Sequence, residues 1–390
     1  MEKISLTMKE AKRFDVIQMA LRGEVSMSKA AEVLGVCLRQ AYRIKKKIKE
    51  KGVKGVVHGN RGSCCKRKLS EKIERRIVDL RKGKYKGFND THFTEKLLAE
   101  GIKLSREKVR RVLRKAGIAS PRKRKPGKYR SRRDRRDSEG LMLQTDGSHH
   151  DWLEGRGPKL CLIGVIDDAT SKVPAVRFED GETTQGYFEV FERAFESKGL
   201  PHSIYADRHS IFRTDRELTI EEQLAGIKKP LTQAGRALDE LGITLIPAGS
   251  PQAKGRIERL WGTFQDRLIS ELRLAGAKTK KEAQAVLNRF VPEYNRRFGR
   301  KPACMKSAWR KLDGFDLKRI LCWKHKRIVA KDNTISFKGL NLQLPKVKPL
   351  QSLVGKKVTV LVLRNRMIEV YYKNLKLAGF ANQNIEMEVA

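Results

Sequence analysis

Three acidic residues stand at places where a folded chain can bring distant side chains together. Asp146 follows an expected short strand at 141–144. Asp207 follows the expected strand 203–206, and Glu258 lies in the first turns of an expected long helix. Hard cations such as Mg2+ bind carboxylate oxygens together with substrate phosphate. Two such ions about 4 Å apart can activate an attacking oxygen and stabilise the leaving oxygen of an in-line displacement.

The start of the long helix carries both a carboxylate and cations. Ser250 is a good N-cap residue and Pro251 suits the first helical position, so we expect the helix to run from about residue 252 to 272. Lys254 and Glu258 are then four residues apart on one face. We expect Lys254 and Arg256 to contact the phosphate backbone of a substrate; the alternative is simple surface charge.

Other polar residues lie near the three acids. His149, His150 and His209 are close to Asp146 and Asp207 in the sequence. They could orient an attacking water or bind phosphate, and they could equally support the loops of the site. Asp167 and Asp168 follow an expected strand at 160–166 and could be metal ligands, but such a pair more often caps the turn into the next strand.

The charge of the chain points to a polyanionic partner. Its 390 residues include 86 Lys and Arg against 45 Asp and Glu, a formal net charge of +41. Nucleic acid is the default partner of so basic a chain. Hydrophobic residues make up 39%, which is enough for folded domains.

A candidate DNA-reading element lies near the N-terminus. The segment 27–36 has small residues and a glycine where two helices of a helix-turn-helix approach each other, and 38–50 is expected to be the second helix. Arg39, Gln40 and Arg43 lie in the half of that helix that enters the major groove, and their side chains suit guanine and adenine edges. The alternative is a helical hairpin with a solvated basic face.

Changes in composition and periodicity predict seven parts. We expect a helix-turn-helix domain at 1–51, a Gly-rich basic connector at 52–69, a second helical DNA-binding domain at 70–120, a basic linker or arm at 121–140, an α/β core with a mixed sheet at 141–300, a connector at 301–320, and a small β-barrel at 321–390. In the arm, phosphate contacts are expected from Arg122, Lys123, Arg124 and Lys125.

The three blocks 144–152, 205–212 and 250–258 resemble the catalytic blocks of the DDE transposase and retroviral integrase superfamily, and in detail those of bacterial insertion-sequence transposases of the ISNCY type. The resemblance covers nearly the whole chain. It implies a ribonuclease H-like core, dependence on Mg2+ or Mn2+ with two ions, and Asp146 and Asp207 as two members of the catalytic and metal-binding triad.

The third member is Glu258. Fifty residues separate it from Asp207, more than in retroviral integrases, and the extra length is expected at 213–229 as a loop or short helix.

The expected function is therefore that of a transposase. It would bind the terminal inverted repeats of its element, hydrolyse phosphodiester bonds at the ends, and join the 3′-OH ends to target DNA. Its partner is double-stranded DNA, and the pairing of two ends implies a homodimer or a higher oligomer. The alternatives are a non-catalytic DNA-binding regulator, a decayed transposase that binds ends without cutting, and a structure-specific nuclease.

Several classes of protein are disfavoured by missing motifs. There is no G-x-x-x-x-G-K-[ST] loop, so no ATP is expected, and no apolar run long enough to span a membrane. None of the six cysteines forms a C-x-x-C pair, so neither a zinc ribbon nor a disulfide framework is expected. We expect a reducing bacterial cytoplasm, with the protein associated with the nucleoid.

Overall fold

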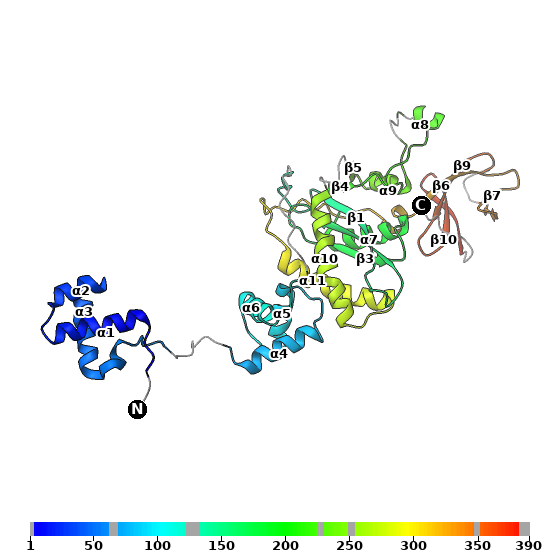
Figure 1. The fold of residues 1–390 in the computed structure, drawn as a ribbon. Helices are drawn as coiled ribbons and strands as arrows, with labels where there is room; N and C mark the ends of the chain where they lie inside the picture. Colours follow the sequence, from blue (N-terminus) through cyan, green and yellow to red (C-terminus); the bar gives the residue numbers. More distant parts are fainter. Residues whose placement is uncertain are drawn as a thin grey trace. The chain divides into compact units, whose positions relative to one another are not determined.

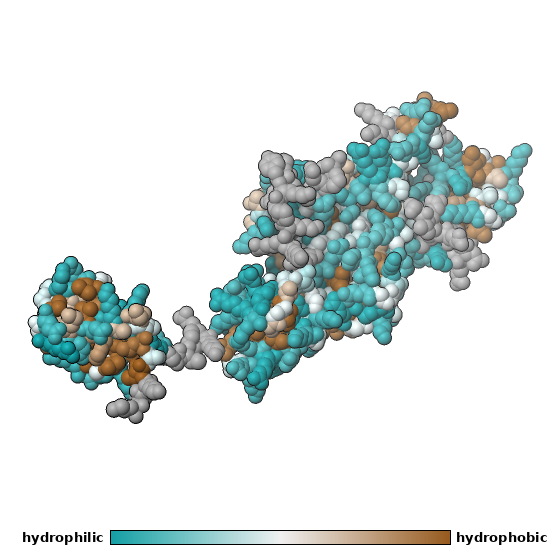
Figure 2. Space-filling view, in the orientation of Figure 1, coloured by the Kyte–Doolittle hydropathy of each residue, from teal (hydrophilic) through white to brown (hydrophobic). Residues whose placement is uncertain are grey.

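The computed structural model describes residues 4–61, 69–121, 133–224, 226, 230–248, 254–346 and 352–381. The chain divides into two compact units, Met1–Arg75 and Arg76–Ala390, which are treated separately (Figure 1). Hydrophilic residues cover most of the surface visible in Figure 2, in keeping with the charged composition. Among the described residues, no helix is both long and apolar enough to cross a membrane.

The first unit is a helix-turn-helix, as predicted. It consists of α1 (Met8–Leu21), α2 (Met27–Leu34), α3 (Leu38–Lys51) and a short 3-10 helix, η1 (Gly52–Val56). Ala30 is fully buried, which lets the neighbouring helices approach closely. Gly35 ends α2 with φ +62°, a left-handed conformation that glycine adopts without strain. Ile17 and Ile44 fill the small core between the helices.

A buried carboxylate fastens the start of this unit to its end. Glu10 forms a capping box with Thr7 at the start of α1. Its side chain also accepts a hydrogen bond from the backbone amide of His58 at 3.1 Å and pairs with Arg61. The backbone amide of Thr7 contributes most to lowering the pKa of Glu10 to about 2, and burial opposes that shift.

We predict that Glu10→Gln weakens this unit at neutral pH. Because the folded pKa lies below the ordinary 4.5, the carboxylate stabilises the fold above about pH 4.5, and this contribution disappears as the pH falls towards about 2. Amide hydrogen exchange in α1 should therefore be faster in the variant than in the wild type at pH 7, with the two converging near pH 2. A difference that does not change with pH would show that the carboxylate charge is not responsible.

Three helices precede the core of the second unit. They are α4 (Glu71–Lys82), which begins before the unit boundary at Arg76, α5 (Asp90–Ala99) and α6 (Arg106–Lys115). Val109 and Leu113 of α6 are fully buried. Arg267 of the core pairs with Glu95 of α5 at 2.9 Å, so this predicted separate domain is joined to the core by ion pairs.

A five-stranded mixed sheet forms the centre of the second unit. Its strands are β1 (Leu143–His150), β2 (Leu160–Asp167), β3 (Ala175–Glu179), β4 (Ser203–Ala206) and β5 (Thr244–Pro247), in the order β3-β2-β1-β4-β5. The first three strands pair antiparallel, whereas β1, β4 and β5 are parallel to one another. The predicted mixed sheet is confirmed. The prediction that the first strand ends before Asp146 is wrong, because β1 continues to pair with β2 as far as His150.

Helices cover both faces of the sheet (Figure 1). On one face, Cys161, Ile163 and Val165 of β2 share a core with α7 (Thr184–Lys198) and α9 (Gln233–Glu240). On the other, alternate β2 residues pack with two long helices. These helices are α10 (Gly255–Leu274) and α11 (Lys280–Phe298).

Alternating side chains thus assign each strand position to a face.

The extra segment between Asp207 and Glu258 contains a short helix, α8 (Ile220–Leu224), as expected.

The C-terminal segment is a set of antiparallel strands that packs on the core. After α12 (Leu317–Ile320), β6 (Trp323–Ile328), β9 (Lys357–Val362), β10 (Met367–Tyr372) and β11 (Leu375–Ala381) form a four-stranded sheet, and β7 (Thr334–Phe337) pairs with β8 (Leu340–Gln343). In the described residues these are two separate sheets, so the predicted barrel closure is not observed. Trp323 packs edge-on against Phe188 of α7, which places this segment in the main core.

Candidate active site

Asp146 lies in the middle of the central strand and faces α10. It pairs with Gly164 across the β1–β2 ladder, and a Cβ at Gly164 would lie 3.1 Å from the ring of Trp261 of α10. Asp146 accepts a hydrogen bond from the indole Nε1 of Trp261 at 3.1 Å. Burial raises the pKa of Asp146 above its ordinary value, while Lys254 and Trp261 oppose that shift. The strand therefore holds a partly buried carboxylate against the first turns of α10.

Asp207 is brought next to Asp146 by the parallel pairing of their strands. It directly follows β4, whose Ile204 and Tyr205 pair with the start of β1. The Nζ of Lys254 lies 2.7 Å from an oxygen of Asp146 and 3.3 Å from an oxygen of Asp207. One ammonium group thus pairs with two carboxylates.

Glu258 lies in the first turn of α10, on the helix face that carries Lys254 and Trp261. Positions four and three residues apart share a helix face, and Glu258 falls between two residues that both contact Asp146. Its side chain is exposed. Within the part of the chain that the structure describes, Asp146, Asp207 and Glu258 are not a group whose ligand atoms all lie within 4.8 Å of one another. The structure therefore brings the two aspartates together around Lys254, and the Glu258 side chain stays exposed to solvent on α10.

The start of α10 differs from the prediction. The helix begins at Gly255, with Lys254 as an N-cap residue that makes no side-chain capping bond. Ser250 and Pro251, predicted to start the helix, lie outside the described residues. The first turn is held by Gln144 of β1, whose side-chain oxygen accepts a hydrogen bond from the amide of Ile257 at 3.3 Å.

Arg256 and the Asp-Asp pair form a structural network behind this turn. Arg256 is 8% exposed and pairs with the fully buried Asp168 at 3.0 Å. Burial lowers the pKa of Arg256 to about 10. Asp167 accepts hydrogen bonds from the amide and hydroxyl of Thr170, each at 2.7 Å, so the turn-capping interpretation of that residue is confirmed. The predicted phosphate contact of Arg256 stays a prediction, and its observed partner is Asp168.

The three histidines have separate surroundings. His209 donates its backbone amide to Asp207 at 3.1 Å and accepts the amide of Ile211 on its ring, so it shapes the loop after β4. The ring of His150 packs edge-on against Trp152. His149 points to the opposite face of the sheet from Asp146, because neighbouring positions of a strand alternate between faces.

The predicted DNA-contact residues of the first unit are accessible. Arg39, Gln40 and Arg43 are all exposed on α3, whereas Ala41 and Ile44 face the core. The arm residues Arg122, Lys123, Arg124 and Lys125 lie outside the described residues.

In the second unit, a shallow cavity of about 430 Å³ beside Asp207 is lined by Arg208, Ser210, Arg213, Thr214 and Asp215. Its guanidinium groups could contact phosphate.

Trp261 and Gln144 were not identified by sequence reasoning. A Trp seven residues after Lys254 lies on the same helix face, which was the available signal for Trp261. Gln144 gave no such signal, because a polar residue in a strand indicates neither its partner nor its burial.

The sheet order, the helices on both faces and the position of Asp146 in the central strand define a ribonuclease H-like core. Residues 13–75 match the winged helix-turn helix family. The chain is 33% identical to "Putative transposase y4bF" of Sinorhizobium fredii over 96% of this chain and 81% of that protein. It is 30% identical to the transposase for insertion sequence IS1202 of Streptococcus pneumoniae, over 75% of this chain and 69% of that protein. The chain therefore belongs to the family of bacterial insertion-sequence transposases.

Solved integrase structures are also similar to this chain. The catalytic core of the HTLV-2 integrase, solved with magnesium in a dimeric form, covers 41% of this chain and 89% of its own, at 19% identity and a TM-score of 0.29. A chain of the simian T-cell lymphotropic virus intasome with the PP2A regulatory subunit B56 gamma covers 78% and 99%, at 15% identity and a TM-score of 0.33. The family assignment rests on the sequence relatives.

Proposed function

We propose that the chain is a DDE-type DNA transposase that binds the terminal inverted repeats of its element, cleaves phosphodiester bonds there and joins the 3′-OH ends to target DNA. The observation that carries the proposal is the pairing of Asp146 and Asp207 across a single ammonium group, with Glu258 on the adjoining helix face. A cluster of carboxylates in a chain of net charge +41 is expected at a site that binds a divalent metal ion together with a substrate phosphate.

The donor set fits Mg2+ or Mn2+. All three proposed ligands are carboxylate oxygens, which hard divalent ions prefer, and Lys254 shows that the place between Asp146 and Asp207 accepts positive charge. When bound, two such ions would supply an activated oxygen nucleophile and stabilise the leaving oxygen. The residues of this chain hold two of the proposed ligands in place: Asp146 is fixed by Trp261, and Asp207 by the His209 amide.

Other groups are proposed to hold the DNA. When a metal ion takes its place between the carboxylates, the Lys254 ammonium group is free to pair with a phosphate oxygen of the DNA. Arg208 and Arg213 line the cavity beside Asp207 and are further candidates for phosphate contacts. The arm residues 122–125 supply further phosphate contacts. Synapsis of two ends requires a homodimer or higher oligomer.

The helix-turn-helix is proposed to read the element ends through Arg39, Gln40 and Arg43. We expect Arg43→Ala to cost about 1–3 kcal/mol of binding free energy on specific ends, because a bidentate contact to a base is lost. Binding to random DNA should fall much less. Fluorescence anisotropy with both DNAs measures the difference, and Lys46→Ala, farther along the exposed face of α3, is the matched control. Equal losses on both DNAs would demote Arg43 to a phosphate contact.

Nicking of end-containing DNA tests the enzyme against the non-catalytic alternatives. A labelled duplex carrying the inverted repeat should be cut at the repeat boundary in Mg2+ and not in EDTA. Specific binding without any cut in Mg2+ or Mn2+ would favour a regulator or a decayed transposase. Metal-dependent cutting at branched structures irrespective of the repeat would favour a nuclease.

A further inference from the structure

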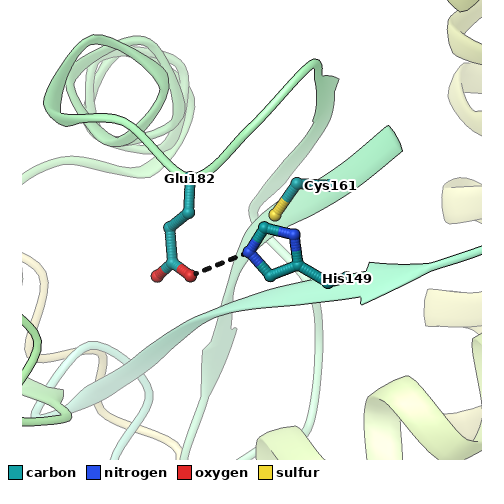
Figure 3. A group of neighbouring side chains, drawn as sticks. All are labelled: His149, Cys161 and Glu182. Atoms are coloured by element: carbon teal, nitrogen blue, oxygen red, sulfur yellow. Dashed lines mark ion pairs between the residues drawn. The ribbon is translucent and has the colours of Figure 1, made fainter. Parts of the chain in front are cut away.

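A second set of metal-binding side chains lies on the other face of the sheet. His149 of β1 and Cys161 of β2 are directly paired across the antiparallel ladder, so their side chains emerge on the same face. Glu182, in the segment before α7, reaches over them (Figure 3). The candidate ligand atoms of these three residues all lie within 4.8 Å of one another, and His149 Nε2 is 3.4 Å from Glu182 Oε2.

This group is separate from the three acids of the proposed active site. Asp146 pairs with Gly164 and contacts α10, whereas Cys161 belongs to the core shared with α7. His149 is three residues after Asp146 on the same strand and therefore points the opposite way. The two sites occupy opposite faces of β1.

Local features hold Glu182 in position. The hydroxyl of Tyr187 donates to one carboxylate oxygen at 2.5 Å, which leaves the other directed towards His149. Gly147 leaves the room that the carboxylate needs, since a Cβ there would lie 2.7 Å from it. A hydrogen bond that orients a ligating carboxylate from behind is typical of metal centres.

We propose that His149, Cys161 and Glu182 bind one Zn2+ ion, with solvent as the fourth ligand. A thiolate and an imidazole are softer donors than Mg2+ prefers, and together with a carboxylate they suit Zn2+. Tetrahedral zinc places its ligand atoms about 3.3–3.8 Å apart. The ligand atoms here lie within 4.8 Å of one another, so a small movement of the exposed His149 side chain would bring them to zinc-binding distances. Binding displaces the thiol proton of Cys161, and the ion fastens the segment before α7 to the β1–β2 ladder.

Cobalt spectroscopy on the full-length protein tests this site without an activity assay. Co2+ bound at this site should give the near-ultraviolet charge-transfer absorption of a cobalt–thiolate bond, and Zn2+ should abolish that absorption. His149→Ala, at an exposed position, should weaken Co2+ binding at least tenfold, and Cys161→Ser should remove the charge-transfer band. Zn2+ should raise the thermal unfolding midpoint of the wild type and not that of His149→Ala.

Two controls assign the signal. Cys304→Ser changes an exposed cysteine elsewhere, and Asp146→Asn changes the opposite face of the sheet; both variants should keep the charge-transfer band. Absence of the band in the wild type overturns the proposal. So does a band that persists in Cys161→Ser, a band lost in Cys304→Ser, or unchanged Co2+ affinity in His149→Ala. Loss of the band in Asp146→Asn would show that the two faces form one site, which also contradicts it.

Discussion

Replacing Asp146 by Asn, Asp207 by Asn or Glu258 by Gln should reduce end cleavage and strand transfer at least about 1,000-fold, while binding to the element ends stays within a few-fold of the wild type. The proposed metal ligands act on the transition state, where a bound ion contributes several kcal/mol, and each 1.4 kcal/mol is a factor of ten in rate. DNA binding uses other residues, so gel shifts with labelled ends should be nearly unchanged.

The glutamate is the most informative of the three. Its side chain is exposed and its assignment depends on the helix face that it shares with Lys254 and Trp261. Glu293→Gln, also exposed and on α11, is the matched control and should cleave normally. If Glu258→Gln joined ends at the wild-type rate, the third ligand would have to be another residue.

Replacing Lys254 by Met should make the protein less stable without metal and more responsive to metal. Its side chain is 10% exposed and lies between two carboxylates. Removing the ammonium leaves Asp146, partly buried, beside Asp207 without a counter-charge. Breaking a fully buried pair costs about 3–5 kcal/mol, and the exposure of Asp207 reduces the expected loss of unfolding free energy to about 1–3 kcal/mol.

Mg2+ should then raise the thermal unfolding midpoint more in Lys254→Met than in the wild type, since the ion no longer competes with the ammonium group. Differential scanning fluorimetry over a range of Mg2+ concentrations, without DNA, measures the effect. Lys281→Met, an exposed residue of α11, is the control and should behave as the wild type. An identical response to Mg2+ in both variants would mean that Lys254 does not occupy the cation position.

Much of this architecture follows from local sequence patterns. Ala30 and Gly35 specify the close approach and the turn of the helix-turn-helix. The position of Asp207 after β4 was predicted because a short apolar strand followed by a polar residue is a strong local signal.

The features that escaped prediction depend on tertiary contacts. Asp146 lies inside a strand because β1 pairs with β2 as far as His150. The length of that pairing depends on β2, and the sequence around Asp146 does not indicate it. The sequence pattern of residues 321–390 predicts a separate domain, yet Trp323 of this segment packs against Phe188 of α7 in the core. His149, Cys161 and Glu182 come from three places in the sequence, and only the β1–β2 register brings the first two together.

We propose that the carboxylates around Lys254 perform DNA joining. The direct measurement uses a pre-cleaved, labelled element end with a free 3′-OH, an unlabelled plasmid as target, and the wild-type protein in Mg2+. We expect the label to become covalently joined to the plasmid in Mg2+. Joining should fail in EDTA and with Asp146→Asn, although that variant still binds the end. Joining that proceeds in EDTA, or that Asp146→Asn carries out at the wild-type rate, would contradict this proposal.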